Sequence, residues 1–333
     1  MKTVLVTGGA GYVGSHCCKA FAQAGWRVVT LDNLSRGRLD AVRWGPFVEA
    51  NVADEATVLS TIDRYQPDVV AHFAAYAYVG ESVDRPDLYY ANNSLATFAL
   101  LEAMRKAGLK RIVFSSTCAT YGHPQQTLID ETHPQAPINP YGWSKFMVER
   151  MLENYAVAFG FSSIALRYFN AAGCDPEGEI GENHDPETHA IPLAIAAALK
   201  PDAEFTVFGT DFDTRDGSAV RDYIHVADLA AAHVLAAERL SSISGAEVFN
   251  LGTGVGTSVL EMIAAVCNAA ERECKMILGP RRAGDPAALV ASAEKAKRVL
   301  GWSPVHSFES IVSTALAWQK INSDAAVVAA SVR

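Results

Sequence analysis

Short strand-like runs alternate with helical segments along the first half of the chain. Each run is four or five residues long, and the runs lie at residues 4–7, 27–31, 69–73 and 111–114. Apolar positions spaced three and four residues apart predict helices between them, at residues 15–24, 55–65 and 88–107. Strands that alternate with helices form parallel sheets, because each crossover helix returns the chain to the same edge. The pattern therefore predicts an α/β fold built on a doubly wound parallel sheet.

The alternation changes character after residue 170. Residues 174–187 are rich in Gly, Pro and Glu and are expected to form a loop. Shorter elements follow, with helices predicted at residues 191–199, 226–239, 258–270 and 308–321 and a strand at residues 249–251. We therefore expect a first domain over residues 1–170 and a smaller mixed α/β domain over residues 171–333.

A glycine-rich segment separates the first strand-like run from the first helix. Gly8, Gly11 and Gly14 give the pattern G-x-x-G-x-x-G. Glycines let the backbone turn tightly and approach a pyrophosphate, which the positive N-terminus of the following helix attracts. A tight turn without a ligand is the alternative for the glycines alone, but the strand–loop–helix context favours a Rossmann-like dinucleotide site.

The second strand-like run ends at Asp32 and Asn33. A dinucleotide-binding fold places an acidic residue there to bond the adenosine ribose. A carboxylate repels a 2′-phosphate, so we expect NAD rather than NADP, although Arg36 and Arg38 lie close enough to keep NADP open. A cap or turn role is the other interpretation of Asp32.

Tyr141 and Lys145 lie four residues apart, on one face of a predicted helix. The ordinary pKa of a phenol is about 10, and a nearby ammonium lowers it, so the pair can act as an acid/base device. Thr117 follows the strand-like run at residues 111–114, and its hydroxyl can bond a reacting oxygen at the same edge of the sheet. Taken alone, the Tyr/Lys pair is more typical of a solvated helix face, and Thr117 of a turn or cap.

Composition limits the partners. The 333 residues are 50% hydrophobic and carry a formal net charge of -9, without a basic stripe, which argues against nucleic acid and anionic membranes. The chain shows no signal-peptide pattern and no apolar run long enough to span a bilayer, so we expect a cytoplasmic protein. The six cysteines lack a C-x-x-C motif and the nine histidines lack a spacing such as H-E-x-x-H, which predicts reduced thiols and no metal.

Several motifs in the same order resemble a known family. The chain is similar to the extended short-chain dehydrogenases/reductases in TGGAGYVG (residues 7–14), HFAA (72–75), SST (115–117) and Tyr141-x-x-x-Lys145. More narrowly, it resembles the UDP-glucose 4-epimerases (UDP-galactose 4-epimerases) in residues 80–82, 121–122, 137–142, 166–170 and 220–226. The match extends to about Trp318. It implies an NAD-binding Rossmann domain at residues 1–170 and a UDP-sugar-binding domain at 171–333, with some later strands joined to the first sheet.

The resemblance also implies roles for particular residues. Tyr141 would be the general base, Lys145 would hold the nicotinamide ribose and lower the pKa of Tyr141, and Thr117 would assist. The implied NAD contacts are Gly8, Gly11, Tyr12, Val13, Gly14, Asp32, Asn33, Asn51, Val52, Phe73, Ala74, Ala75, Asn92, Tyr141, Lys145 and Phe169. The implied UDP-sugar contacts are Thr117, Asn170, His189, Arg221, Arg282, Asp285 and Leu289. The chain departs from the family where Asn51-Val52 replaces Asp-Ile and Ala77 replaces Lys, which bears on cofactor affinity.

The implied activity is reversible C4 epimerisation of UDP-glucose and UDP-galactose through a transient 4-keto sugar. Leu289 stands where such epimerases carry a bulky Tyr beside the hexose, so the N-acetylhexosamine pair is a further candidate. UDP-xylose/UDP-arabinose 4-epimerase is an alternative, and a non-catalytic NAD-sensing regulator is an alternative of another class. Cys118-Ala119 after Thr117 argue against a 4,6-dehydratase, which has Asp-Glu there. The two long helices near residues 88–107 and 141–159 and the family likeness predict a homodimer.

Overall fold

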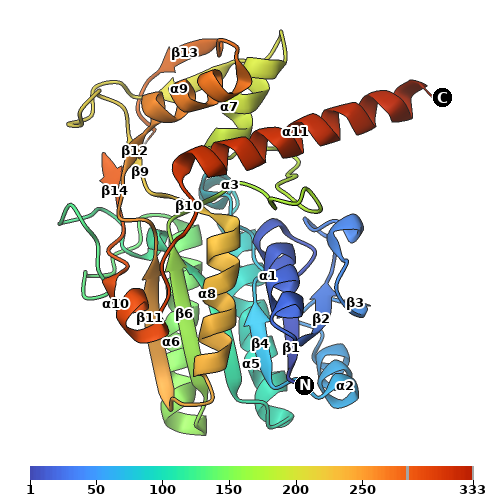
Figure 1. Ribbon diagram of the computed structural model, residues 1–333. Helices are drawn as coiled ribbons and strands as arrows, with labels where there is room; N and C mark the ends of the chain where they lie inside the picture. Colours follow the sequence, from blue (N-terminus) through green and yellow to red (C-terminus); the bar gives the residue numbers. More distant parts are fainter. Residues whose placement is uncertain (283–284, 332–333) are drawn as a thin grey trace.

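The computed structural model describes residues 1–282 and 285–331, with side chains through residue 322. Its largest feature is a sheet of seven parallel strands in the order β11-β6-β5-β4-β1-β2-β3 (Figure 1). The strands are β1 (Thr3–Thr7), β2 (Arg27–Asp32), β3 (Phe47–Glu49), β4 (Val69–His72), β5 (Arg111–Thr117), β6 (Ser162–Tyr168) and β11 (Gly245–Leu251). The predicted Rossmann-like doubly wound sheet is confirmed.

Helices cover both faces of this sheet, because alternate strand residues point to opposite faces. From β1, Val4 and Val6 enter one buried apolar cluster, together with residues of α1 (Tyr12–Gln23), α8 (Val226–Arg239) and α10 (Glu294–Leu300). Leu5 enters the opposite cluster, which includes residues of α2 (Glu55–Tyr65), α5 (Ala96–Lys106) and α6 (Pro140–Phe159). The central strands are thus buried on both sides.

The helix expected at residues 88–107 has a more complex structure. The short helices α3 (Val79–Asp84) and α4 (Pro86–Tyr89) come first, then a π-helical segment at Tyr90–Leu95, and then α5. A π-helical segment adds a residue to the turn, and such segments are frequent at functional sites. The apolar pattern marks the helix but does not show this change of hydrogen-bond register.

The second half of the chain builds a smaller region above the carboxyl ends of the large sheet (Figure 1). Its strands form three small sheets: β7 (Asn170–Ala172) with β10 (Tyr223–His225); β9 (Val220–Arg221) between β12 (Thr257–Ser258) and β14 (Ala288–Leu289); and β8 (Phe205–Phe208) with β13 (Met276–Gly279). Three helices share its apolar core: α7 (Ala190–Leu199), α9 (Val259–Ala270) and α11 (Phe308–Ser331).

A later strand of this half rejoins the large sheet, as the resemblance implied. Strand β11 pairs with β6 in the large sheet, and α8 packs on its face, so the chain returns to the first half after leaving it.

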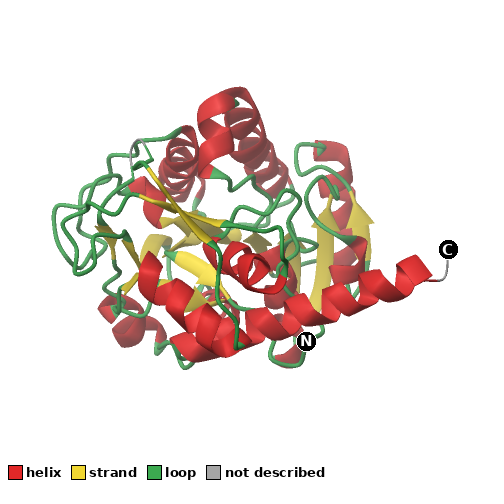
Figure 2. Ribbon diagram, turned by 90° about the horizontal axis from the view of Figure 1, so that it is seen from above, coloured by secondary structure: helices red, strands yellow, loops and turns green. Residues whose placement is uncertain are grey.

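Helix α11, the long helix that leads to the C-terminus in Figure 2, continues ten residues beyond the predicted end at residue 321. No Gly or Pro lies between residues 322 and 331 to stop it. Among the described helices, none is both long and apolar enough to cross a membrane.

Candidate active site

A cleft opens at the carboxyl ends of β1, β2 and β4, where the strand order reverses and a doubly wound sheet binds its ligands. The predicted cofactor residues that line it are Gly8, Gly11, Asp32, Asn33, Asn51, Val52, Phe73, Ala74, Ala75 and Asn92. Tyr12, Val13 and Gly14 form the first turn of α1 beside it. The hydroxyl of Tyr12 donates a 2.5 Å hydrogen bond to the carbonyl oxygen of Gly173.

The glycine loop keeps the floor of this cleft free of side chains. Gly8 has a φ of +74°, and a Cβ there would lie under 3.0 Å from the backbone of Ala74. A Cβ on Gly14 would likewise meet the carbonyl oxygen of Gly8. Only glycine permits this close packing of the loop, α1 and the end of β4. The backbone at the start of α1 is therefore open to a phosphate, as a dinucleotide requires.

Asp32 is held in place at the end of β2. One carboxylate oxygen accepts the N–H of Ala10 at 3.0 Å and the other accepts the N–H of Leu34 at 2.8 Å. Arg36 pairs with Glu81 at 2.6 Å and Arg38 pairs with Asp40 at 2.7 Å, so both arginines are already neutralised by carboxylates. This arrangement fits a ribose with free hydroxyls, and it favours NAD over NADP.

The sequence brings Tyr141 and Lys145 to this edge through the start of α6. Asn139 caps the helix by accepting the N–H of Gly142 at 2.8 Å, and Pro140 occupies its first position. The Lys145 ammonium is buried and donates a 2.8 Å hydrogen bond to the carbonyl oxygen of Ser115. The predicted pair therefore lies at the carboxyl end of β5, the strand next to β4.

Burial controls the protonation of this pair. Desolvation lowers the pKa of Lys145 to about 7, against the opposing effect of Glu149. Desolvation raises the pKa of Tyr141 to about 12, while a hydrogen bond with Thr117 lowers it. Thr117 thus acts directly on the phenol, and all three predicted catalytic residues belong to one site.

A buried network that the sequence analysis did not assign lies next to this site. Arg167 donates to both carboxylate oxygens of Glu149, at 2.9 and 2.6 Å, and to the hydroxyl of Tyr121 at 2.9 Å. Ser116 bonds Glu149 as well, at 2.5 Å. Glu149 lies one turn beyond Lys145 on α6, so this ion pair fixes α6 against β5 and β6.

Asn93 is a second residue that the sequence analysis missed. Its amide accepts the N–H of Tyr76 at 2.8 Å, donates to the carbonyl of Tyr76 at 2.9 Å and donates to the hydroxyl of Ser144 at 3.0 Å. It belongs to the π-helical segment, and it joins the loop after β4 to α6. A buried Asn inside a predicted helix was the available signal, because such a residue needs partners outside the helix.

The predicted substrate residues fall into separate groups. Arg221 lies 3.6 Å from Asp285, and Leu289 is its neighbour on β14. Leu289 packs against the buried cluster that contains Cys118 and Phe169. Phe169 connects β6 to β7, and Asn170 is the first residue of β7.

The other two predicted substrate residues lie apart from Arg221. The guanidinium of Arg282 lies 3.8 Å from the ring centroid of Phe208, and its side chain is exposed. His189 immediately precedes α7, and its Nδ1 faces the carboxylate of Glu182. No interaction among the described residues joins either side chain to Arg221.

The fold and the site together define an enzyme of the Rossmann class in which a half-buried Tyr, a buried Lys and a buried Thr lie at the carboxyl edge beside a dinucleotide cleft. The profile of the NAD-dependent epimerase/dehydratase family matches residues 4–252, and the chain belongs to this family.

Named relatives agree with this assignment. The chain is 50% identical to the UDP-glucose 4-epimerase of Rhizobium leguminosarum bv. trifolii, over 95% of this chain and 97% of that protein. It is similar to the crystal structure of UDP-glucose 4-epimerase from Brucella ovis in complex with NAD, with a TM-score of 0.93 and 48% identity over 95% of this chain and 98% of that one. The Bifidobacterium longum enzyme in complex with NAD+ and UDP gives a TM-score of 0.92 and 37% identity over 97% and 99%.

Proposed function

We propose that this chain is an NAD-dependent UDP-glucose 4-epimerase that interconverts UDP-glucose and UDP-galactose. The observation that carries the proposal is the placement of Tyr141, Lys145 and Thr117 at the carboxyl edge of the sheet that also forms the dinucleotide cleft. The family is NAD-dependent, and relatives over nearly the full length are UDP-glucose 4-epimerases. The alternatives, a pentose-specific epimerase and a non-catalytic regulator, have no comparable support.

Each catalytic residue has a distinct task in this proposal. Tyr141 takes the proton from the sugar 4-hydroxyl and returns it, and Thr117 stabilises the phenolate by hydrogen bonding. Lys145, anchored on Ser115, holds the nicotinamide ribose. NAD, held by the glycine loop, Asp32 and Lys145, would supply reversible hydride transfer at C4 with no net change in its own oxidation state. The reaction is therefore redox-neutral overall.

Inversion requires that the nucleotide be held firmly while the hexose turns. Arg221, in contact with Asp285, and Asn170 at the start of β7 lie above the carboxyl edge and are proposed to bind the UDP diphosphate and sugar. A guanidinium pairs with diphosphate oxygens in bidentate geometry. His189, which precedes α7, and Arg282, which lies over Phe208, are proposed as further contacts with the UDP-sugar. Binding energy from the remote nucleotide then positions C4 without fixing one face of the sugar.

We also propose a cytoplasmic homodimer. Large apolar side chains are exposed along the helices before and after β5, with Leu95 at 64%, Phe98 at 46%, and Trp143 and Met147 at 40% each. A second copy would bury these residues across a two-fold axis. All six cysteines are free thiols, which supports a reducing compartment. A monomeric mass by light scattering at micromolar concentration would contradict the dimer.

The activity is tested by incubating the purified protein with UDP-galactose and without added NAD. We expect UDP-glucose to form up to an equilibrium mixture, because NAD copurifies with the protein and is regenerated in every turnover. Stoichiometric accumulation of free NADH with a stable oxidised sugar would instead identify a dehydrogenase.

A further inference from the structure

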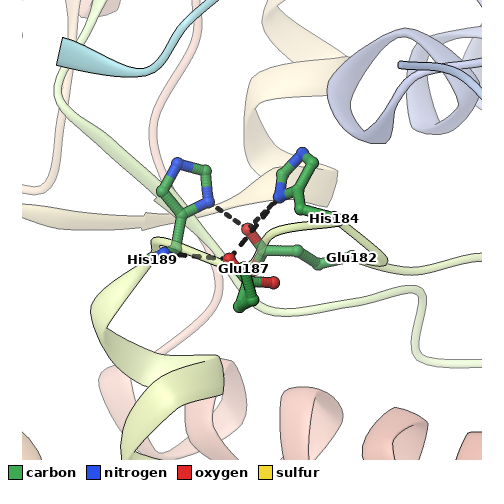
Figure 3. Close-up of side chains that lie close together, drawn as sticks. All are labelled: Glu182, His184, Glu187 and His189. Carbon is green, nitrogen blue, oxygen red and sulfur yellow. Dashed lines mark hydrogen bonds and ion pairs between the residues drawn. The ribbon is translucent and has the colours of Figure 1, made fainter. Parts of the chain in front are cut away.

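Two histidines and two glutamates gather in the loop between β7 and α7. Glu182, His184, Glu187 and His189 have the spacing E-x-H-x-x-E-x-H, and one donor atom from each lies within 4.8 Å of the others. Figure 3 shows both imidazole rings directed at the two carboxylates, which face one another beneath them. The catalytic proposal uses only His189 from this set.

The donor atoms of His184 and of the two glutamates lie near the spacing expected for ligands of one small cation. His184 Nδ1 lies 3.2 Å from Glu182 Oε1 and 3.6 Å from Glu187 Oε1, and His189 Nδ1 faces the same oxygen of Glu182. A tetrahedral Zn²⁺ site has metal–ligand distances of about 2.0–2.2 Å, which places neighbouring donor atoms about 3.3–3.6 Å apart. The two imidazoles therefore approach a common point with the carboxylates.

Hydrogen bonding within the cluster is incomplete. The contacts of His184 Nδ1 with Glu182 and Glu187 are short but lack the alignment of a hydrogen bond, so this buried nitrogen has no hydrogen-bond partner among the described residues. Buried polar atoms without a partner are uncommon and costly. A cation at the shared point would satisfy the lone pair of this nitrogen.

The carboxylates are fixed in advance. The Glu182 side chain is 3% exposed, and its backbone is held by an N–H bond to Cys174 Sγ and by the indole of Trp318, which donates to its carbonyl at 2.9 Å. Glu187 Oε1 accepts the backbone N–H groups of Thr188 and His189, each at 2.8 Å. A buried carboxylate such as Glu182, with a second carboxylate beside it, needs compensating positive charge nearby.

We propose that Glu182, His184, Glu187 and His189 form a structural binding site for one divalent transition-metal ion of the Zn²⁺ class. Imidazole and carboxylate ligands suit Zn²⁺, and four protein ligands leave no open position for catalysis. One divalent cation neutralises the two carboxylates while both histidines stay uncharged. This departs from the sequence expectation of no metal, which considered only familiar ligand spacings.

The ion would stabilise the loop that joins the two halves of the molecule. Within this loop, the carbonyl of Gly173 accepts a hydrogen bond from the hydroxyl of Tyr12. The two carboxylate oxygens of Asp175 accept hydrogen bonds of 2.9 and 2.8 Å from the buried ammonium of Lys19 on α1. The ring of His184 packs edge-on against Tyr12, with 6.0 Å between centroids. Binding through Nδ1 leaves Nε2–H of His189 as a donor. The metal and the proposed substrate contact then use different nitrogens.

The competing explanation is a cluster neutralised by two protons. Burial would lower the pKa of His184, but its contacts with Glu182 and Glu187 raise it to about 9 in the absence of metal. Two imidazolium rings would balance the charge as well as one cation. Direct measurement of metal separates the two states.

The test uses full-length protein purified without a metal-affinity column or chelator, with metal content measured by plasma mass spectrometry. We expect about one zinc per chain in the wild type and less than one tenth of that in His184→Ala. Losing a ligand should weaken binding by more than the 10- to 100-fold typical of outer-shell changes. His123→Ala replaces an exposed histidine elsewhere and should keep the wild-type zinc content.

A second measurement uses the wild type alone, so the proposal can be tested even if His184→Ala does not fold. Wild-type protein is stripped with a chelator and titrated with Zn²⁺ and with Co²⁺. We expect a higher Tm on adding Zn²⁺, because the metal binds only the folded state, and strong visible absorption from tetrahedral Co²⁺. A wild type that purifies without metal and shows neither response would overturn the proposal and leave the protonated cluster. Epimerase activity is not part of either readout, so this test and that of the proposed function fail independently.

Discussion

The ammonium group of Lys145 donates a 2.8 Å hydrogen bond to the carbonyl oxygen of Ser115. This bond joins α6 to the carboxyl end of β5. Ser115 lies two residues before Thr117 on that strand, and the Thr117 hydroxyl lowers the pKa of the Tyr141 phenol. The relationship between helix and strand therefore assembles the catalytic group before any ligand binds.

Tyr141→Phe is expected to lower kcat by roughly 10²-fold or more, because it removes the positioned acid/base while keeping the ring. Affinity for UDP, measured by calorimetry, should stay nearly unchanged. Tyr90→Phe provides a matched control on a neighbouring helix. A Tyr141→Phe variant with wild-type kcat would remove Tyr141 from the mechanism.

Thr117→Val should shift the acidic limb of the pH profile of kcat/KM to higher pH. The Thr117 hydroxyl lowers the pKa of Tyr141, so its loss raises that pKa, and a base with a higher pKa is protonated up to a higher pH. A shift of about one pH unit corresponds to a hydrogen bond of about 1.4 kcal/mol. The loss of activity should be greatest at pH values below the pKa of Tyr141 and should diminish as the pH rises through that pKa. Thr117→Ser keeps the hydroxyl and should restore the wild-type profile; an unshifted profile in Thr117→Val would show that the hydroxyl does not act on the base.

Glu149→Ala should lower the free energy of unfolding by about 3–5 kcal/mol, because it leaves the buried Arg167 without its counter-ion. Glu153→Ala, on the same helix, removes a half-exposed partner of Arg150 and should cost at most about 1 kcal/mol. Chemical denaturation followed by circular dichroism measures both. Equal effects of the two substitutions would mean that the buried pair does not stabilise the junction of α6 with the sheet.

Leu289→Tyr is expected to reduce kcat/KM for UDP-N-acetylgalactosamine relative to UDP-galactose by roughly 10- to 100-fold. Leu289 lies beside Arg221 on the neighbouring strand and packs against the cluster of Cys118 and Phe169, so a larger ring there would fill part of the proposed hexose site. Discrimination by a small apolar volume is worth about 1–3 kcal/mol. Leu278→Tyr, at an exposed position on β13, serves as the control. An unchanged ratio of the two kcat/KM values would show that Leu289 is not the gate.

The sequence predicts those features of this molecule that depend on local spacing. Apolar periodicity predicts most of the parallel strands and most helices, and a four-residue spacing places Tyr141 and Lys145 on one face of α6. The ion pair of Glu149 with Arg167 could not be predicted in this way, because its members lie on different elements and meet only through packing. The π-helical position of Asn93 depends on hydrogen-bond register, which the apolar pattern does not record.

Loops were the least predictable part of the site. Residues 174–187 were expected to form a loop, but their composition did not indicate that Glu182 and His184 would fold back together with His189. The side chain of Arg282, predicted to contact the nucleotide, lies over Phe208, a contact that depends on the pairing of β8 with β13 nearby. Such contacts are set by tertiary structure rather than by spacing along the chain.

The central claim is that hydride leaves C4 of the sugar and returns to the same carbon. The most direct measurement is incubation of the purified protein, without added NAD, with UDP-galactose that carries deuterium at C4, followed by NMR and mass spectrometry of the products. The account predicts UDP-glucose that retains the deuterium at C4, without exchange with solvent and without net NADH. Loss of the label to water, or failure of any UDP-glucose to form, would contradict it.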